Sequence, residues 1–171
     1  AYPYDANRQL SIVGSWQLAA EVGAIGVGPS VGDITSWSND QDVPNVRRCL
    51  FDDTYFFGPD GSFSNLMGSA TWVETWQGVD VEGCTQPVSP HDGVQLASYI
   101  LDDSAGTLSI SGLGAHIGLA KVVNGAEITS PDEAVSDIVY TVSEMTDTTM
   151  TLHIEAGTGD LWRFKLVRSP D

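Results

Sequence analysis

Residues 138–166 read IVYTVSEMTDTTMTLHIEAGTGDLWRFKL, and three stretches of this segment alternate between apolar and polar side chains. An apolar residue at every second position is the pattern of a β-strand with one buried face. The apolar sets are Ile138, Tyr140 and Val142, then Met150, Leu152 and Ile154, and finally Trp162, Phe164 and Leu166. We therefore expect three consecutive strands of a curved antiparallel sheet.

Similar but shorter segments occur upstream, separated by clusters of Gly, Pro, Asp and Asn. Strands are predicted over residues 11–18, 51–57, 62–66, 71–77, 96–101 and 107–111. Long loops are predicted over residues 23–45, 79–93 and 112–131, the first folding over an opening or a side of the sheet. The Gly-Pro-Asp-Gly sequence at 58–61 is typical of a hairpin turn, and Ser130 or Asp132 can cap a short helical turn at 130–134.

This spacing of strands and turns predicts an all-β fold. Either an antiparallel lipocalin-like barrel or a strongly curved two-sheet sandwich with long loops satisfies the pattern. No repeat, linker or change of composition divides the chain, so we expect a single β domain over residues 1–171.

The composition limits the partners. The formal net charge is −16, with 7 Lys and Arg residues against 23 Asp and Glu residues. Such a surface is repelled by nucleic acid and by anionic membranes, both of which bind basic proteins. The apolar runs are too short to span a bilayer, so we expect no membrane insertion. Neutral ligands and cations fit the charge, which is also typical of a well-solvated surface with no partner.

The chain has two cysteines, Cys49 and Cys84, and each lies in a loop-like stretch. We expect a disulfide rather than two free thiols, which predicts a secreted or cell-surface protein. Two cysteines without a CxxC motif do not make a typical zinc site.

Two pieces of sequence resemble lipocalin-like barrels. These are Gly14-Ser15-Trp16 in the first predicted strand and Trp162-Arg163-Phe164 in the last. Lipocalin-like barrels carry Gly-x-Trp in their first strand, with a basic residue of the final strand packed across the tryptophan. The resemblance implies a cation–π contact between Arg163 and Trp16.

A second set of segments covers nearly the whole chain. It comprises GSWQL at 14–18, GVGP at 26–29, GDI at 32–34, the segment around Trp37, RCLFDD at 48–53, WVETWQ at 72–77, PHDG at 90–93 and WRFKL at 162–166. Together these segments resemble a module of marine Bacteroidetes, attached there to secreted polysaccharide-degrading enzymes, including glycoside hydrolase family 16, and to surface glycan-binding proteins. The resemblance implies secretion, a glycan context and a larger parent protein, and it brings no catalytic motif.

Several residues are candidates for binding a sugar. Trp72, Glu74 and Trp76 would share one face of a strand, with the two indoles about 13 Å apart. Indole rings stack on the C–H faces of sugars and a carboxylate accepts hydroxyl hydrogen bonds, although the same face could be core. Trp37 lies in a polar stretch and serves either as a stacking platform or as a loop anchor. Asp53, His91 and Asp92 are further polar candidates.

Other chemistry has weaker support. Asp52-Asp53, Asp102-Asp103 and residues 39–42 contain oxygen ligands for a structural calcium ion, but Asp beside Gly or Pro more often forms turns. The three histidines lack metal-ligand spacing and no serine lies in a nucleophile motif, so we assign no catalytic residue, metal ligand or cofactor.

The leading prediction is a non-catalytic carbohydrate-binding module for a neutral polysaccharide. The alternatives are a structural or adhesive subunit that associates with itself or a larger protein, and a lipocalin-type carrier with an internal cavity of several hundred Å³.

Overall fold

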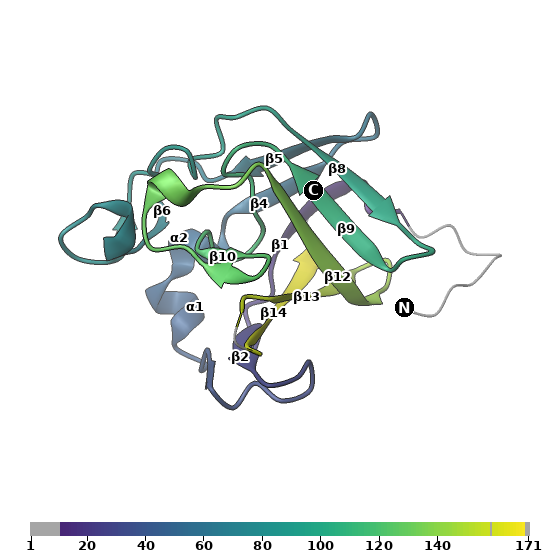
Figure 1. Cartoon of the computed structure of the whole chain (residues 1–171), viewed down its shortest axis with the longest axis horizontal. Coiled ribbons are helices and arrows are strands. Elements are labelled where there is room, and N and C mark those ends of the chain that lie inside the picture. The colour runs from purple at the N-terminus through teal and green to yellow at the C-terminus, as the bar shows by residue number, and fades with distance from the viewer. Residues whose placement is uncertain (1–10, 158, 170–171) are drawn as a thin grey trace.

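A closed β-barrel forms the body of the protein in the computed structural model, which describes residues 11–157 and 159–169. Its eight antiparallel strands follow the order β1-β4-β5-β8-β9-β12-β13-β14, and pairing between β14 and β1 closes the sheet (Figure 1). The barrel strands are β1 (Gly14–Leu18), β4 (Thr54–Phe57), β5 (Ser62–Leu66), β8 (Ala97–Asp102), β9 (Thr107–Ser111), β12 (Asp137–Met145), β13 (Thr149–Glu155) and β14 (Leu161–Arg168). Of the two predicted architectures, the structure has the barrel.

The last three strands confirm the alternation in the sequence. Every second side chain of β12, β13 and β14 points into the barrel, and the nine apolar residues predicted to be buried are each at most 5% exposed. Strand β9 and strand β5 also have the predicted bounds, and Ser130 caps the predicted turn η2 (Pro131–Glu133) by accepting a hydrogen bond from the Asp132 N–H.

The predicted loop over residues 23–45 contains two strands that the sequence analysis missed. These are β2 (Ile25–Gly28) and β3 (Trp37–Ser38), which extend the sheet beyond β14. β14 pairs with β2 through its first half and with β1 through its last residues. Glycine is required within β2, because a Cβ at Gly28 would overlap the Asp33 carbonyl group. Two glycines in four residues hide the strand pattern from a reading of the sequence.

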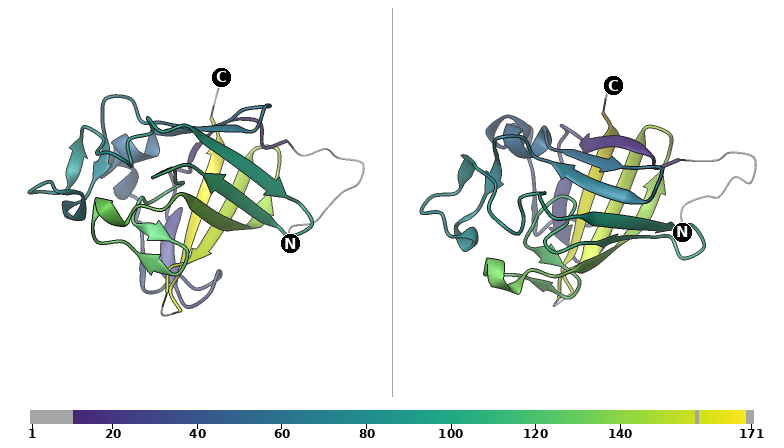
Figure 2. Two further views of the ribbon diagram at one scale, coloured as in Figure 1. Left: turned by 45° about the horizontal axis from the view of Figure 1, so that its top comes forward. Right: turned by 90° about the horizontal axis from the view of Figure 1, so that it is seen from above.

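Short elements gather at one end of the barrel (Figures 1 and 2). They are α1 (Val43–Val46), α2 (Arg48–Phe51), the hairpin of β6 (Thr71–Val73) and β7 (Gly83–Thr85), the 3₁₀ helix η1 (Thr75–Gln77), and the hairpin of β10 (Val122–Val123) and β11 (Ala126–Glu127). Two predicted strands are therefore shorter than expected: residues 51–57 begin in a helix, and residues 71–77 end in one.

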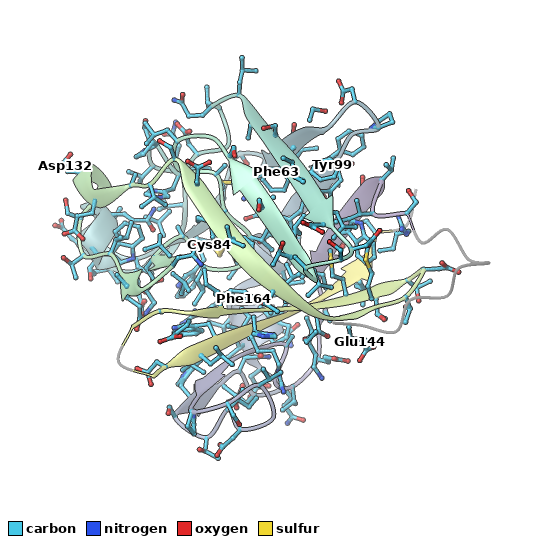
Figure 3. All side chains as sticks on the ribbon, turned by 45° about the vertical axis from the view of Figure 1, so that its right-hand side comes forward. Phe63, Cys84, Tyr99, Asp132, Glu144 and Phe164 are labelled. Carbon is cyan, nitrogen blue, oxygen red and sulfur yellow. A yellow bond between two sulfur atoms is a disulfide. The ribbon has the colours of Figure 1, made fainter. Side chains whose placement is uncertain are left out.

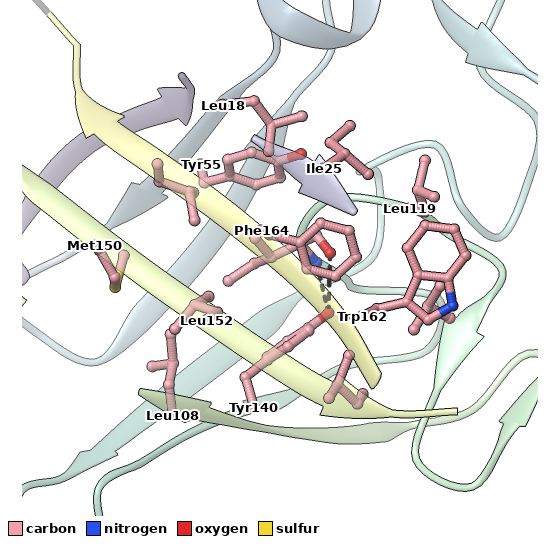
Figure 4. Packing of buried hydrophobic residues seen from close by; sticks show 14 of the residues in the cluster. Leu18, Ile25, Tyr55, Leu108, Leu119, Tyr140, Met150, Leu152, Trp162 and Phe164 are labelled. Carbon is pink, nitrogen blue, oxygen red and sulfur yellow. Dashed lines mark hydrogen bonds between the residues drawn. The ribbon is translucent and has the colours of Figure 1, made fainter. Parts of the chain in front are cut away.

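The barrel interior is filled by its own side chains. Trp16, Tyr55, Tyr140, Phe57 and Phe164 are fully buried, and Figure 4 shows part of this packing. The loop after β9 closes one end: the Ile117 N–H donates to the Tyr140 hydroxyl at 2.8 Å, and the Gly118 N–H donates to the Tyr55 hydroxyl at 3.0 Å. This filling leaves little support for a carrier with a large internal cavity.

The cation–π contact at Trp16 exists, but Arg163 does not make it. The guanidinium carbon of Arg168 lies 4.4 Å from the Trp16 ring centroid, and Arg168 also donates to the carbonyls of Ser11 and Val13. Arg163 instead donates to the Gly23 carbonyl at 2.9 Å. The expectation was wrong because β1 pairs with the end of β14, where Trp16 lies opposite Arg168.

The predicted disulfide between Cys49 and Cys84 is present and joins α2 to β7 (Figure 3). In residues 11–157 and 159–169, no helix has the length and apolar character needed to cross a lipid bilayer.

Candidate functional site

Two tryptophans lie side by side where the sheet extends beyond the barrel. Trp162 of β14 is opposite Val27 of β2, and Val27 is opposite Trp37 of β3. Directly opposed residues of paired strands point to the same face of a sheet, so these three side chains form one row. The Trp37 and Trp162 ring centroids are 6.2 Å apart at an interplanar angle of 50°. Trp162 is 5% exposed at the edge of the core (Figure 4), whereas Trp37 is 37% exposed.

Arg47 covers the same site from the helical side. Cys84 lies opposite Trp72 in the β6–β7 pairing, and its disulfide to Cys49 holds α2 next to this hairpin. Arg47 directly precedes α2, and its guanidinium carbon lies 4.6 Å from the Trp72 ring centroid and 5.6 Å from that of Trp37. A cation at these distances from the rings is attracted to both. The disulfide therefore helps to place this arginine.

Glu74 and Lys121 complete a surface pocket of about 290 Å³, which we call the Trp37 pocket. It is lined by Val27, Trp37, Arg47, Glu74, Leu119, Lys121 and Trp162. The Lys121 ammonium group lies 3.3 Å from the Glu127 carboxylate, 3.9 Å from that of Glu74 and 5.5 Å from the Trp162 ring centroid. The volume is near the lower limit of small-molecule pockets, about 300–1,000 Å³. An aromatic surface bordered by hydrogen-bonding groups can hold a ring that has one apolar face and polar edges.

The predicted row of Trp72, Glu74 and Trp76 does not exist as a single strand face. β6 ends at Val73, and Glu74 caps η1 in a reciprocal pair with Gln77. The turn separates the indoles: Trp72 lies under Arg47, while the Trp76 ring packs edge-on against His91 at 5.4 Å. The period-two argument was wrong here because a capping box starts a helix in the middle of the predicted strand.

Three other candidates lie away from the Trp37 pocket. Asp53 and His91 are buried, with 1% and 4% exposure, and Asp92 accepts a hydrogen bond from the Val94 N–H in a local turn. The structure thus brings Trp37 and Glu74 together in the pocket and places Trp72 against Arg47, outside the pocket lining. Trp76, Asp53, His91 and Asp92 also lie outside it.

Asp53 and His91 belong to a buried polar region beside the core. One Asp53 carboxylate oxygen accepts a 2.6 Å hydrogen bond from the Thr71 hydroxyl, and the other has no partner among the described residues. Burial raises the pKa of Asp53 to about 8, with a smaller contribution from the Asp52 charge, although the Thr71 bond opposes the shift. Burial also lowers the pKa of His91 to about 4, and the His116 ring, 5.8 Å away, adds to this effect.

This polar region encloses little space. His91, His116 and Thr71 line a pocket of about 20 Å³, which is enough for a water molecule but not for a sugar. In the described part of the chain, no three His, Cys, Asp or Glu side chains come together in a way that could hold a metal ion. Of the aspartates considered for calcium, Asp102 accepts hydrogen bonds from Ser104 and Ala105 within its turn.

Five pocket residues were not predicted as site residues: Val27, Arg47, Leu119, Lys121 and Trp162. Trp162 was expected to be buried, and the two cations are separated from Trp37 by many residues in a chain dominated by acids. The sequence did contain one signal: the chain has only seven Lys and Arg residues, so each of them could have been considered as a binding residue. Two of the seven line this pocket.

Comparison with protein-family models finds no match, and comparison with curated proteins finds none either. The structure itself defines the class, a closed eight-stranded antiparallel barrel consistent with the lipocalin-like architecture. An aromatic pocket with charged walls lies at one end of this barrel.

Proposed function

We propose that this chain is a non-catalytic carbohydrate-binding module of a secreted or cell-surface protein, with the Trp37 pocket as its binding site. The observation that carries the proposal is the Trp37 indole, which is 37% exposed and held at a fixed tilt against Trp162 in a pocket of about 290 Å³. An ordered, partly exposed aromatic ring loses little conformational freedom when a sugar stacks on it.

Polar groups surround this platform as a saccharide requires. Glu74 can accept hydroxyl hydrogen bonds, while Arg47 and Lys121 can only donate them. The disulfide supports an oxidising location, such as the cell surface or the medium. The overall charge of −16 favours a neutral polysaccharide at long range, whereas the pocket itself contains two cations.

Isothermal titration calorimetry with a panel of neutral and acidic oligosaccharides tests the proposal. Trp37→Ala should weaken binding of the best ligand at least about tenfold, which is typical of a central aromatic residue, and Trp37→Phe should restore part of the affinity. Leu96→Ala is the control, since Leu96 is 97% exposed and lies outside the pocket. Equal affinities for wild type and Trp37→Ala would exclude this site. No binding by any saccharide would refute the function.

A structural or adhesive subunit is the second candidate, because one outer surface of the barrel carries exposed apolar side chains. Ile100 of β8 and Val139 of β12 both pair with Ser109 of β9, so they lie in one row. They are 69% and 42% exposed, and Leu96 next to β8 is 97% exposed. A self-associating subunit would show a concentration-dependent mass by analytical ultracentrifugation, which Ile100→Ser should abolish. A constant monomer mass would reject this candidate.

A further inference from the structure

We infer that the Trp37 pocket recognises an anionic saccharide, one that carries a carboxylate or a sulfate ester, and that Arg47 is the residue that binds its anionic group. This inference rests on the proposed function and specifies its ligand. The net charge of −16 on the whole chain favours a neutral ligand, whereas two cations line the pocket itself.

The first observation is that the described part of the chain offers Arg47 no acidic partner. Among the described residues, no carboxylate forms an ion pair with Arg47, and its side chain has no hydrogen-bond acceptor. In the described part of the chain, Arg48, Arg163 and Arg168 also form no ion pair. Arg163 and Arg168 donate hydrogen bonds to backbone carbonyls, however, whereas the Arg47 guanidinium group donates none to a described residue. Lys121, the other cation of the pocket, is already shared by Glu74 and Glu127.

The second observation is that Arg47 is held in place without using its hydrogen bonds. Its guanidinium carbon is 4.6 Å from the Trp72 ring centroid and 5.6 Å from that of Trp37, and the side chain is half-buried. Contacts with aromatic rings restrict the group, while its N–H donors form no hydrogen bond with another residue that the structure describes. A planar guanidinium group that is positioned in this way binds carboxylate or sulfate oxygens through two parallel hydrogen bonds.

The third observation is the place of Arg47 relative to the stacking platform. Arg47 and Trp37 line the same pocket of about 290 Å³ and are in cation–π contact. The guanidinium group lies over the Trp37 ring, so a sugar that enters the pocket beside Trp37 comes within reach of the Arg47 N–H donors. Arg47 and Lys121 balance Glu74 of the lining and Glu127, the ion-pair partner of Lys121, so this part of the surface has no net negative charge on a chain of net charge −16.

Matched pairs of ligands test the inference by isothermal titration calorimetry. We would use a galacturonic acid oligosaccharide with its methyl ester, and a sulfated galactan oligosaccharide with its desulfated form. The charged member of one pair should bind at least about tenfold more tightly than its neutral counterpart, since a charge-assisted bidentate contact is lost in the latter. The first pair reports recognition of a carboxylate and the second reports recognition of a sulfate.

Arginine variants then assign the contact. Arg47→Met keeps a long apolar stem against Trp72 and should remove the preference for the charged ligand, whereas Arg47→Lys keeps the charge without the planar fork and should restore only part of it. Arg48→Met is the matched control, because Arg48 is adjacent and exposed but lines a different pocket. Thermal unfolding of each variant separates a binding defect from a folding defect, and a purely structural Arg47 would change stability but not the ratio of affinities.

The two proposals fail differently. Equal binding of charged and neutral ligands that still depends on Trp37 would overturn the inference and leave the binding-module function intact. A charge preference that survives in Arg47→Met would also overturn it. No binding of any saccharide would overturn both.

Discussion

The buried Asp53 carboxyl group should make the protein less stable as the pH rises from 6.5 to 8. Its pKa is about 8 in the folded protein and 3.8 without the protein environment, so the folded state holds a proton that the unfolded state has lost. Stability falls with pH wherever the folded state binds more protons. The contribution of Asp53 is therefore complete below about pH 4 and disappears as the pH approaches 8.

His91 has the opposite effect on stability between about pH 4 and 6.5. Its pKa is about 4 when folded against 6.5 otherwise, so its contribution increases stability as the pH rises from about 4 to 6.5. His116 and His153 act in the same direction as His91, because burial lowers their pKa values too. Above pH 6.5 the histidine contributions level off, while the Asp53 contribution continues to fall. One pKa unit corresponds to about 1.4 kcal/mol, so we expect Asp53 to lower the free energy of unfolding by about 2 kcal/mol between pH 6.5 and 8, with the histidines offsetting part of this loss.

Urea unfolding at a series of pH values, with the disulfide intact, measures this loss. For an m-value of about 2 kcal/mol/M, the wild-type midpoint should fall by about 1 M relative to that of Asp53→Asn between pH 6.5 and 8. Asp53→Asn is nearly isosteric with the protonated acid and can still accept the Thr71 hydrogen bond, and its own midpoint should not fall. Asp80→Asn, a substitution at an exposed position, should behave as the wild type. A constant difference between the midpoints of wild type and Asp53→Asn would refute the reasoning.

Two further substitutions test the frame that holds the site. Replacing both Cys49 and Cys84 by serine opens a loop of 35 residues and should lower the free energy of unfolding by about 3–4 kcal/mol, measured by urea titration; an unchanged stability would show that the bridge does not restrain the unfolded chain. Gly118→Ala should cost about 2–4 kcal/mol, because the new Cβ would lie 2.5 Å from the Phe164 ring and φ is +78°. Gly125→Ala has a similar φ of +81° with no atom within 4 Å, so it should cost only about 1 kcal/mol; equal thermal shifts for the two variants would contradict the packing argument.

The candidate site was only partly predictable. Trp37 was identified because an indole in a polar segment has little reason to be there unless it binds or anchors something. The row from Trp72 to Trp76 was mispredicted, since the period-two rule does not register a capping box that turns the chain at Glu74. Asp53 and His91 are residue types that often bind ligands, but both are buried in a polar region beside the core. Burial of a single polar residue cannot be seen in one sequence.

Periodicity failed where glycine replaced side chains. β2 has only two apolar side chains, Ile25 and Val27, because its glycines make room for Asp33 and Ile34, so a core strand was predicted as a loop. The arginine over Trp16 was misassigned for a related reason. Pairing register decides which residue of β14 faces Trp16, and both Arg163 and Arg168 carry the required charge.

The sequence by itself determined the all-β class, the inward faces of the last three strands and the pair of cysteines. These features depend on residues close together in the chain or on there being only two cysteines. Tertiary structure decided that the sheet closes, that the barrel is filled, and that Trp37, Arg47, Glu74, Lys121 and Trp162 meet in one pocket. These five residues come from five separate segments, and their positions are fixed by strand register and a disulfide, which local patterns do not encode.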